Sequence, residues 1–196
     1  MKKICVISGT RAEFGLLKNL IEKLFSSKSF ETFFLVTGSH LSKSHGSTID
    51  EIYNSKIKIT NTINLHINDD SQLSIIKYVS LGIKEFGIEF ERIKPNLIIV
   101  LGDRYEIISA VISACILNIP IAHIHGGEVT EGAIDDAFRH SITKFSHLHF
   151  VSNEIYRQRV IQMGESPQRV FNVGAMALDA ITGLELISKE QIEKDL

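Results

Sequence analysis

The chain has 196 residues, with 21 Lys and Arg against 23 Asp and Glu, and a formal net charge of −2. This near-neutrality argues against a dedicated nucleic-acid-binding protein, because that function usually shows as a strongly basic face. Hydrophobic residues make up 44% and charged residues 22%, which is typical of a globular protein with a sizeable core. Cys5 and Cys115 each lie in an apolar run, so we expect buried reduced thiols rather than a disulfide or a zinc site.

Neither a signal peptide nor a membrane span is expected. The longest apolar run, residues 107–117, carries Ser109 and Ser113 and falls short of the ~18 residues that a membrane span needs. The apolar stretch near the start is interrupted by Arg11 and Glu13, which is too early for a signal peptide. We therefore expect a cytoplasmic protein.

Short apolar strand patterns alternate with helical patterns along the chain. The first half is predicted to contain a strand at 3–8, a helix at 14–25, a strand at 33–37, a loop and short helix over 40–53, a strand at 57–67, a helix at 73–93 and a strand at 97–101. The second half is predicted to contain a helix at 105–117, a strand at 121–124, a helix at 135–145, a strand at 148–151, a helix at 154–163, a strand at 170–173 and a helix from 177 onward. This order predicts the α/β class, with a doubly wound parallel sheet, Rossmann-like, and helices on both faces.

Ligands of such sheets bind at the carboxyl ends of the strands, so the loops after residues 8, 101, 124 and 173 are the candidate site. Gly9, Thr10 and Arg11 open the first loop, where free backbone N–H groups at a helix start and a guanidinium suit a phosphate. The spacing matches neither a dinucleotide fingerprint nor a P-loop. A surface ion pair of Arg11 with Glu13 or another carboxylate explains the same residues equally well.

Asp103 follows the strand at 97–101 directly, which places a carboxylate at the ligand edge of the sheet. The alternative is that Asp103 caps the helix that starts near Tyr105, a common use of Asp. The two roles do not exclude each other.

The loop after residue 124 combines imidazole, glycine and carboxylate groups. His123 and His125 are two residues apart, so on a strand they point the same way. With Glu128 they suggest a metal site, which we disfavour because the spacing of metal-binding motifs is missing. Gly126 and Gly127 favour instead a close approach of the backbone to a ligand.

Two acid–base pairs begin the helix at 135–145. Asp135 and Arg139 are four residues apart, and so are Asp136 and His140, which predicts an ion pair within each couple. Alone, such pairs are typical of a solvated first helical turn. Directly after the histidine and glycine loop, they favour a functional role.

Six motifs occur in a characteristic order along the chain. They are Gly9-Thr10-Arg11-Ala12-Glu13, Val36-Thr37-Gly38-Ser39-His40, Gly102-Asp103-Arg104-Tyr105-Glu106, His123-Ile124-His125-Gly126-Gly127-Glu128, Ile134-Asp135-Asp136 and Arg139-His140-Ser141-Ile142-Thr143-Lys144. Together they resemble the hydrolysing UDP-N-acetylglucosamine 2-epimerases of sialic-acid and legionaminic-acid biosynthesis. The resemblance implies the first of two Rossmann-like domains that face a cleft, as in GT-B glycosyltransferases. We expect this domain at residues 1–175, and residues 176–196 as the start of the connection to a second domain that is absent here.

The family reaction removes the proton at sugar C2 while the nucleotide leaves C1, and water then adds at C1. Reprotonation of C2 on the opposite face gives the manno-configured free sugar and UDP. Such a reaction needs acid/base groups on two faces of the ring and stabilisation of the departing diphosphate. The resemblance implies a UDP-sugar substrate, no cofactor and no metal, no nucleic-acid or membrane partner, and a homodimer of the full-length protein.

Motif by motif, the resemblance makes Asp103 and Asp135 acid/base carboxylates, Arg11 a phosphate contact, and Arg139 and His140 orienting groups. His125 stands where many relatives have a Glu proposed for proton transfer, so that role falls to His125 or to Glu128. The remaining expected substrate contacts are Gly9, Thr10, His40, Gly126, Gly127 and Asp136.

Other functions stay open at this point. They are a non-catalytic nucleotide-sugar-binding half, a GT-B-like glycosyltransferase, which residues 134–144 argue against, and a metal-dependent phosphoesterase. Half of a two-domain cleft leaves the diphosphate partly solvated, so we expect little or no turnover from this chain alone. The sequence does not fix the group at sugar C4, nor UDP against GDP.

Overall fold

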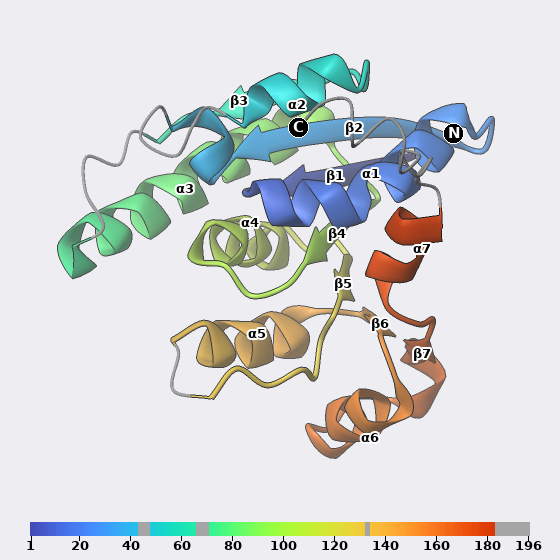
Figure 1. Cartoon of the computed structure of the whole chain (residues 1–196). Helices are drawn as coiled ribbons and strands as arrows, with labels where there is room; N and C mark the ends of the chain where they lie inside the picture. The colour runs from blue at the N-terminus through green and yellow to red at the C-terminus, as the bar shows by residue number, and fades with distance from the viewer. Residues whose placement is uncertain (43–47, 66–70, 132–133, 183–196) are drawn as a thin grey trace, which may run out of the picture.

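The computed structural model describes residues 1–42, 48–65, 71–131 and 134–182 (Figure 1). Parallel strands form one seven-stranded sheet in the order β3-β2-β1-β4-β5-β6-β7. Their bounds are β1 Lys2–Ser8, β2 Phe30–Thr37, β3 Asn61–Ile63, β4 Leu97–Leu101, β5 Ile121–Ile124, β6 Leu148–Val151 and β7 Val170–Asn172. The order confirms the doubly wound, Rossmann-like α/β class.

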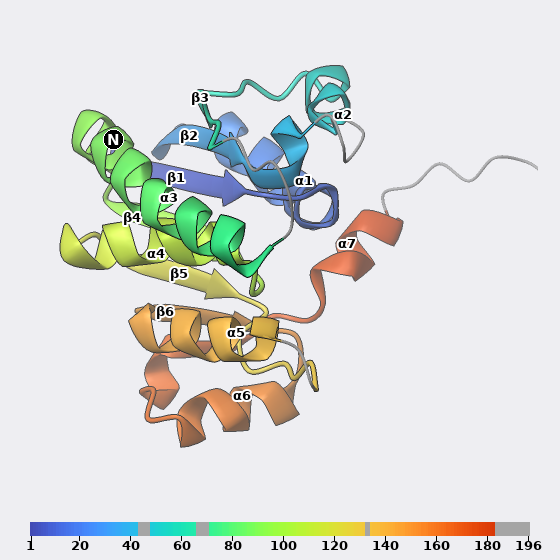
Figure 2. The ribbon, with the colours of Figure 1, turned by 90° about the vertical axis from the view of Figure 1, so that its left-hand side faces the viewer.

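Helices cover both faces of the sheet. They are α1 Arg11–Ser26, η1 Gly38–Leu41, α2 Ile49–Asn54, α3 Gln72–Ile93, α4 Tyr105–Ile116, α5 Ile134–Phe145, α6 Glu154–Gln162, η3 Pro167–Arg169 and α7 Met176–Thr182. Helices α3, α4 and α5 lie side by side on one face, and α1 and α2 lie on the other (Figure 2). Among the described residues, no helix is long and apolar enough to cross a membrane.

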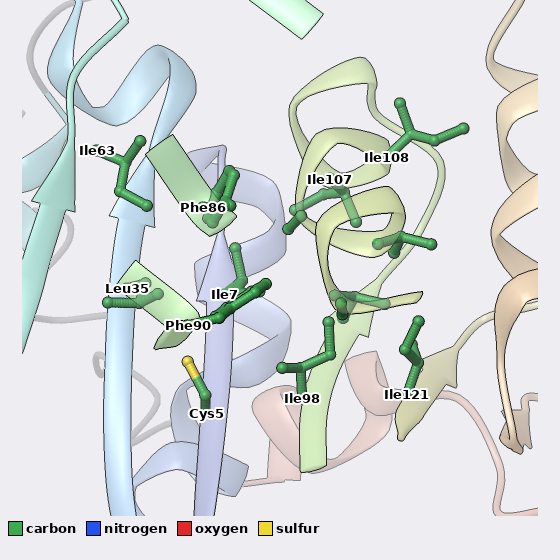
Figure 3. Packing of buried hydrophobic residues seen from close by; sticks show 14 of the residues in the cluster. Cys5, Ile7, Leu35, Ile63, Phe86, Phe90, Ile98, Ile107, Ile108 and Ile121 are labelled. Atoms are coloured by element: carbon green, nitrogen blue, oxygen red, sulfur yellow. The ribbon is translucent and has the colours of Figure 1, made fainter. Parts of the chain in front are cut away.

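The core lies on both faces because every second side chain of a central strand points to the same side. In β1, Cys5 and Ile7 pack under α3 and α4, whereas Ile4 and Val6 pack under α1. Figure 3 shows the first of these two clusters, in which Phe86 and other apolar side chains of α3 and α4 lie over the strands. A sheet buried in this way is closely packed on both faces, so it fixes where each strand ends and its loop begins.

One predicted strand is much shorter in the structure. Of the strand predicted at 57–67, only Asn61–Ile63 pairs in the sheet, and residues 66 and 67 lie outside the described part. Before it, Thr60 hydrogen-bonds to Phe34 through its backbone N–H at 2.8 Å and through its side-chain oxygen at 2.9 Å. The side chain thus takes one place of the strand ladder, and regular pairing starts only at Asn61.

Cys115 is exposed, contrary to expectation, and Cys5 is buried. Ala114 of α4 is fully buried, and the next residue of a helix is turned by about 100°. Cys115 therefore lies on the solvent side of α4.

The switch point of the sheet lies between β1 and β4, because the chain runs outward from β1 in one direction and from β4 in the other. Ligands of this class bind at the carboxyl ends of the strands around that point. The loops that follow β1, β4 and β5 all end at this edge, since the three strands are neighbours and parallel.

Candidate functional site

The loop after β1 is held from two sides. Thr10 caps α1, with its side-chain oxygen accepting the N–H of Glu13 at 3.3 Å. The N–H of Gly9 donates to Glu13 Oε2 at 2.6 Å, and Ser39 Oγ donates to the Gly9 carbonyl at 3.2 Å. Gly38 has φ +63°, and a Cβ there would lie 2.5 Å from the Gly9 carbonyl oxygen. The close crossing of two backbones at this point therefore needs glycine.

Two buried carboxyl groups lie beneath this crossing. Glu13 is 5% exposed and Glu106 only 1%. Burial raises the pKa of Glu13 to about 8, against the effect of its bond to Gly9. Burial also raises the pKa of Glu106, although Arg104 contacts that carboxylate through two nitrogens at 3.3 Å and opposes the rise. Glu13, Glu106 and Arg104 were not predicted from the sequence as site residues. The feature of the sequence that could have indicated them is their position as charged residues within a few positions of the end of a predicted strand.

Arg11 and His40 are already engaged. Arg11 Nε lies 2.6 Å from Glu51 Oε1 in an exposed ion pair, so the predicted surface partner is a carboxylate of α2 and not Glu13. His40 is fully buried, with its ring nitrogens 3.0 Å from Ser8 Oγ and 2.9 Å from Thr48 Oγ1. Burial lowers the pKa of His40 to about 4. His40 thus ties η1 to β1, and a contact of His40 with substrate stays a prediction.

Arg139 is the centre of a second cluster, at the ends of β4 and β5. Its Nη2 binds Asp103 Oδ2 and lies 3.2 Å from Thr130 Oγ1, and its Nη1 lies 3.9 Å from Glu128 Oε2. The predicted Asp135–Arg139 pair was wrong, because α5 turns the guanidinium toward the β4 loop. The capping role considered for Asp103 was also wrong, since α4 begins after Arg104 without a side-chain cap.

His125 and Glu128 form a pair beside Arg139. His125 Nδ1 lies 3.4 Å from Glu128 Oε1, which also accepts from Ser152 Oγ at 2.9 Å. His125 Nε2 is buried and has no hydrogen-bond partner among the described residues. Burial lowers the pKa of His125, Glu128 opposes that effect, and Arg139 adds to it. An imidazole with one nitrogen set by a carboxylate and the other unpartnered can accept or donate a proton.

The first turn of α5 supplies the remaining predicted residues. Asp136 and His140 pair as predicted, with Oδ2 and Nε2 3.7 Å apart, and Asp136 also accepts the N–H of Thr130 at 3.0 Å. Asp135 is half-buried, and its charge raises the pKa of both Arg104 and Glu106. Asp135 therefore acts electrostatically on Arg104 and Glu106 from the first turn of α5.

His123 and His125 do not follow one strand alternation. β5 ends at Ile124, and His125 has a left-handed backbone with φ +65°. His123 is fully buried. Gly127 has φ +80°, and a Cβ there would lie 2.7 Å from the Tyr156 carbonyl oxygen, so this loop packs tightly on α6.

No group of three or more His, Cys, Asp or Glu residues in the described ranges is arranged to hold a metal ion. The cluster of Asp103, His125, Glu128 and Arg139 instead offers proton-transfer groups beside a cation. The fold defines a Rossmann-like domain, and this polar cluster at the carboxyl edge of the sheet is its candidate ligand site.

A sequence model of the UDP-N-acetylglucosamine 2-epimerase family matches residues 22–196. The chain belongs to this family. It is 44% identical over 195 residues to GDP/UDP-N,N'-diacetylbacillosamine 2-epimerase (hydrolyzing) of Campylobacter jejuni, with 100% of this chain and 50% of that protein covered. It is 38% identical to the UDP-N,N'-diacetylbacillosamine 2-epimerase (hydrolyzing) of Legionella pneumophila, over 92% of this chain and 48% of that one.

The fold is also that of a solved member of the family. UDP-GlcNAc 2-epimerase from Neisseria meningitidis, solved with UDP-GlcNAc bound, superposes with a TM-score of 0.82 at 22% identity. The match covers 93% of this chain and 48% of that structure. The chain thus spans about half the length of the relatives it matches.

Proposed function

We propose that this chain provides the N-terminal half of a hydrolysing 2-epimerase that acts on a nucleotide-linked 2-acetamido sugar. The observation that carries the proposal is the cluster of Asp103, His125, Glu128 and Arg139 at the carboxyl edge of the sheet, next to the Gly9 loop. The names of the curated relatives support it.

In the proposed reaction the C2–H proton passes to a base while the C1–O bond breaks and the nucleoside diphosphate leaves. Water then adds at C1, and an acid returns a proton to C2 on the opposite face. The two faces need different groups. Asp103 and Asp135 are our candidates for carboxylate proton transfer. Arg139, which binds Asp103, holds that carboxylate in place.

We assign the further proton-transfer role to His125 rather than to Glu128. Both Glu128 oxygens already have neighbours: Oε1 contacts Ser152 and His125, and Oε2 faces Arg139. The Nε2 atom of His125 is unpartnered among the described residues. Glu128 is then the positioning residue that orients the imidazole. His140 and Asp136, which pair on α5, are proposed to lie at the border of the same site.

The diphosphate is proposed to bind at the loop after β1. Thr10 and the start of α1 offer backbone N–H groups and the positive end of a helix dipole. Gly9, whose own N–H is donated to Glu13, lets the diphosphate approach the backbone closely. Arg11 is exposed, and a surface ion pair such as that with Glu51 contributes about 0–1 kcal/mol, so a phosphate competes easily for its guanidinium. Gly126 and Gly127 are proposed to lie against the sugar.

The substrate is proposed to be a sugar with acetamido groups at C2 and C4, because the relatives at 44% and 38% identity are both named for diacetylbacillosamine. We further propose that residues 1–175 form one domain and that residues 176–196 begin the connection to a second half. A homodimer stays a prediction.

The test is product analysis with the full-length gene product. It is incubated with UDP-N-acetylglucosamine and with UDP- and GDP-linked N,N'-diacetylbacillosamine, and nucleotide and free sugar are identified by NMR. We expect release of nucleoside diphosphate with a manno-configured free sugar, fastest from a diacetylated substrate. Intact substrates, or transfer of the sugar to an acceptor, would contradict the proposal.

A further inference from the structure

His123 is a buried histidine that the proposed mechanism does not use, yet it contacts the backbone of the site. Its Nε2 lies 2.7 Å from the carbonyl oxygen of Gly102, the residue before Asp103. Its Nδ1 lies 3.2 Å from Thr143 Oγ1, on α5 one turn after Arg139. Both side chains are fully buried. One imidazole therefore bridges the β4 loop and the helix that carries Arg139.

The same pair also supports the loop after β5. A Cβ built on Gly126 would lie 3.0 Å from His123 Nδ1 and 3.0 Å from Thr143 Oγ1, so the bare backbone of Gly126 rests on both atoms. Gly126 directly follows His125. The segments that carry Asp103, His125 and Arg139 thus all meet at one buried hydrogen-bonded pair.

The geometry fixes which ring nitrogen of His123 carries the proton. A carbonyl oxygen only accepts, so Nε2 must donate to Gly102. Burial lowers the pKa of His123 to about 3, with the nearby His149 and Arg139 adding to the effect. The ring is therefore neutral, Nδ1 is an acceptor, and the hydroxyl of Thr143 donates to it. The Thr143 hydroxyl also donates to the Arg139 carbonyl at 3.0 Å, so its one proton is shared between that carbonyl and His123 Nδ1.

We propose that His123 and Thr143 are positioning residues that set Asp103 and His125 against Arg139 through this neutral Nε2–H tautomer. The proposal rests on the proposed function, because it concerns the same site. The rate depends strongly on the distance between reacting groups, since a misplacement of about 1 Å can lower it about 100-fold. Neither side chain reaches substrate, because both are fully enclosed.

The decisive pair of variants in the full-length protein is Thr143→Val and Thr143→Ser. Valine has the shape of threonine but no hydroxyl, whereas serine keeps the hydroxyl. We expect Thr143→Val to lower kcat for nucleotide release by about 10- to 100-fold with KM within about 3-fold. We expect Thr143→Ser to stay within about 3-fold of the wild type.

A matched control lies on the same helix. Ser141 Oγ donates to the Ala137 carbonyl at 2.8 Å, the same type of bond to a helix carbonyl, but without a histidine partner. Ser141→Ala should leave kcat unchanged. Equal losses in Thr143→Val and Thr143→Ser, or no loss in either, would overturn the proposal.

His123→Gln separates positioning from proton transfer. Glutamine keeps an N–H donor for Gly102 but cannot titrate, so we expect the limbs of the pH profile of kcat/KM to keep their positions while the rate falls. Disappearance of the acidic limb in this variant would make His123 the titrating group and overturn the proposal.

Histidine ¹⁵N NMR keeps this inference separate from the proposed function, because it needs no turnover. We expect the wild type to show a neutral Nε2–H ring for His123 down to pH 5, and Thr143→Val to shift its Nδ1 resonance. A protonated ring, or the Nδ1–H tautomer, would overturn the inference even if the enzyme is active. A wild type without activity but with this tautomer would contradict only the proposed function.

Discussion

At the residue scale, the site is a set of charged groups whose partners come from different loops. Arg139 binds Asp103 from the β4 loop and faces Glu128 from the β5 loop. Removing one member of a buried pair leaves the other uncompensated, which costs more than the pair itself contributes. Substitutions in this cluster should therefore be conservative in shape if their effect on chemistry is to be measured.

Asp103→Asn should lower the rate of nucleotide release by about 100- to 10,000-fold, the typical contribution of a general acid or base. The amide keeps the shape of the carboxylate and can still accept a hydrogen bond from Arg139. The measurement is steady-state release of nucleotide by full-length variants. Asp50→Asn, at an exposed position on α2, is the control and should be fully active. Near-normal turnover of Asp103→Asn would remove Asp103 from the mechanism.

His125 predicts a pH dependence. Burial lowers its pKa from the ordinary value of 6.5. Because a base must be neutral to accept a proton, kcat/KM should fall as the pH is lowered, with a midpoint below pH 6.5. Glu128 raises this pKa, so Glu128→Gln should move the midpoint to still lower pH and reduce the rate. Glu91→Gln, at an exposed position on α3, should leave the midpoint unchanged. A midpoint that rises in Glu128→Gln is incompatible with the assigned pair.

At the element scale, the crossing of the loop after β1 with η1 sets how α1 begins. The backbone contact between Gly9 and Gly38 brings η1 close enough for Ser39 to bind the Gly9 carbonyl. Beneath it, the buried carboxyl of Glu13 accepts the N–H of Gly9. Backbone conformation and a buried acid thus hold the proposed phosphate loop together.

Gly38→Ala should destabilise the protein by about 1–3 kcal/mol, because φ of +63° strains alanine and its Cβ would collide with the Gly9 carbonyl. Denaturant unfolding measures the difference. Gly87→Ala is the matched control on α3, where a Cβ meets nothing within 4 Å. Since alanine is the better helix former, that change should stabilise the protein by about 0.5–1 kcal/mol. Equal effects of the two changes would contradict the described crossing.

Glu13 makes stability depend on pH. Its pKa of about 8 in the folded state exceeds the ordinary value of 4.5, so unfolding between these values releases a proton. The free energy of unfolding should then fall as pH rises from 4.5 to 8, by about 1.4 kcal/mol per pH unit at most for this one group. Glu13→Gln should flatten this fall, leaving only the part due to Glu106, whose pKa burial also raises. Glu22→Gln, at an exposed position on α1, should leave the slope of the free energy of unfolding against pH unchanged. Identical slopes for the two variants would contradict the raised pKa of Glu13.

At the scale of the whole molecule, the sequence predicted the architecture well because its signals are local. Apolar strand runs and helical periodicity gave the β-α order, and the doubly wound rule placed the loops after residues 8, 101 and 124 at one edge. The partner of Arg139 could not be predicted in this way. The spacing favoured Asp135, but the actual partner, Asp103, depends on how α5 packs against the β4 loop. The burial of Glu13 and Glu106 likewise depends on a tertiary crossing that no local pattern encodes.

The molecule described is half the length of its relatives, so the proposed reaction belongs to the full-length protein. The central step of this reaction is the removal of the proton at sugar C2 by a base. The most direct measurement of that step is the deuterium content of the product at C2. The full-length enzyme is run to completion in deuterated water, and C2 of the released sugar is examined by proton NMR. We predict one deuterium at C2 of a manno-configured product. A product that retains its original hydrogen at C2 would contradict the account.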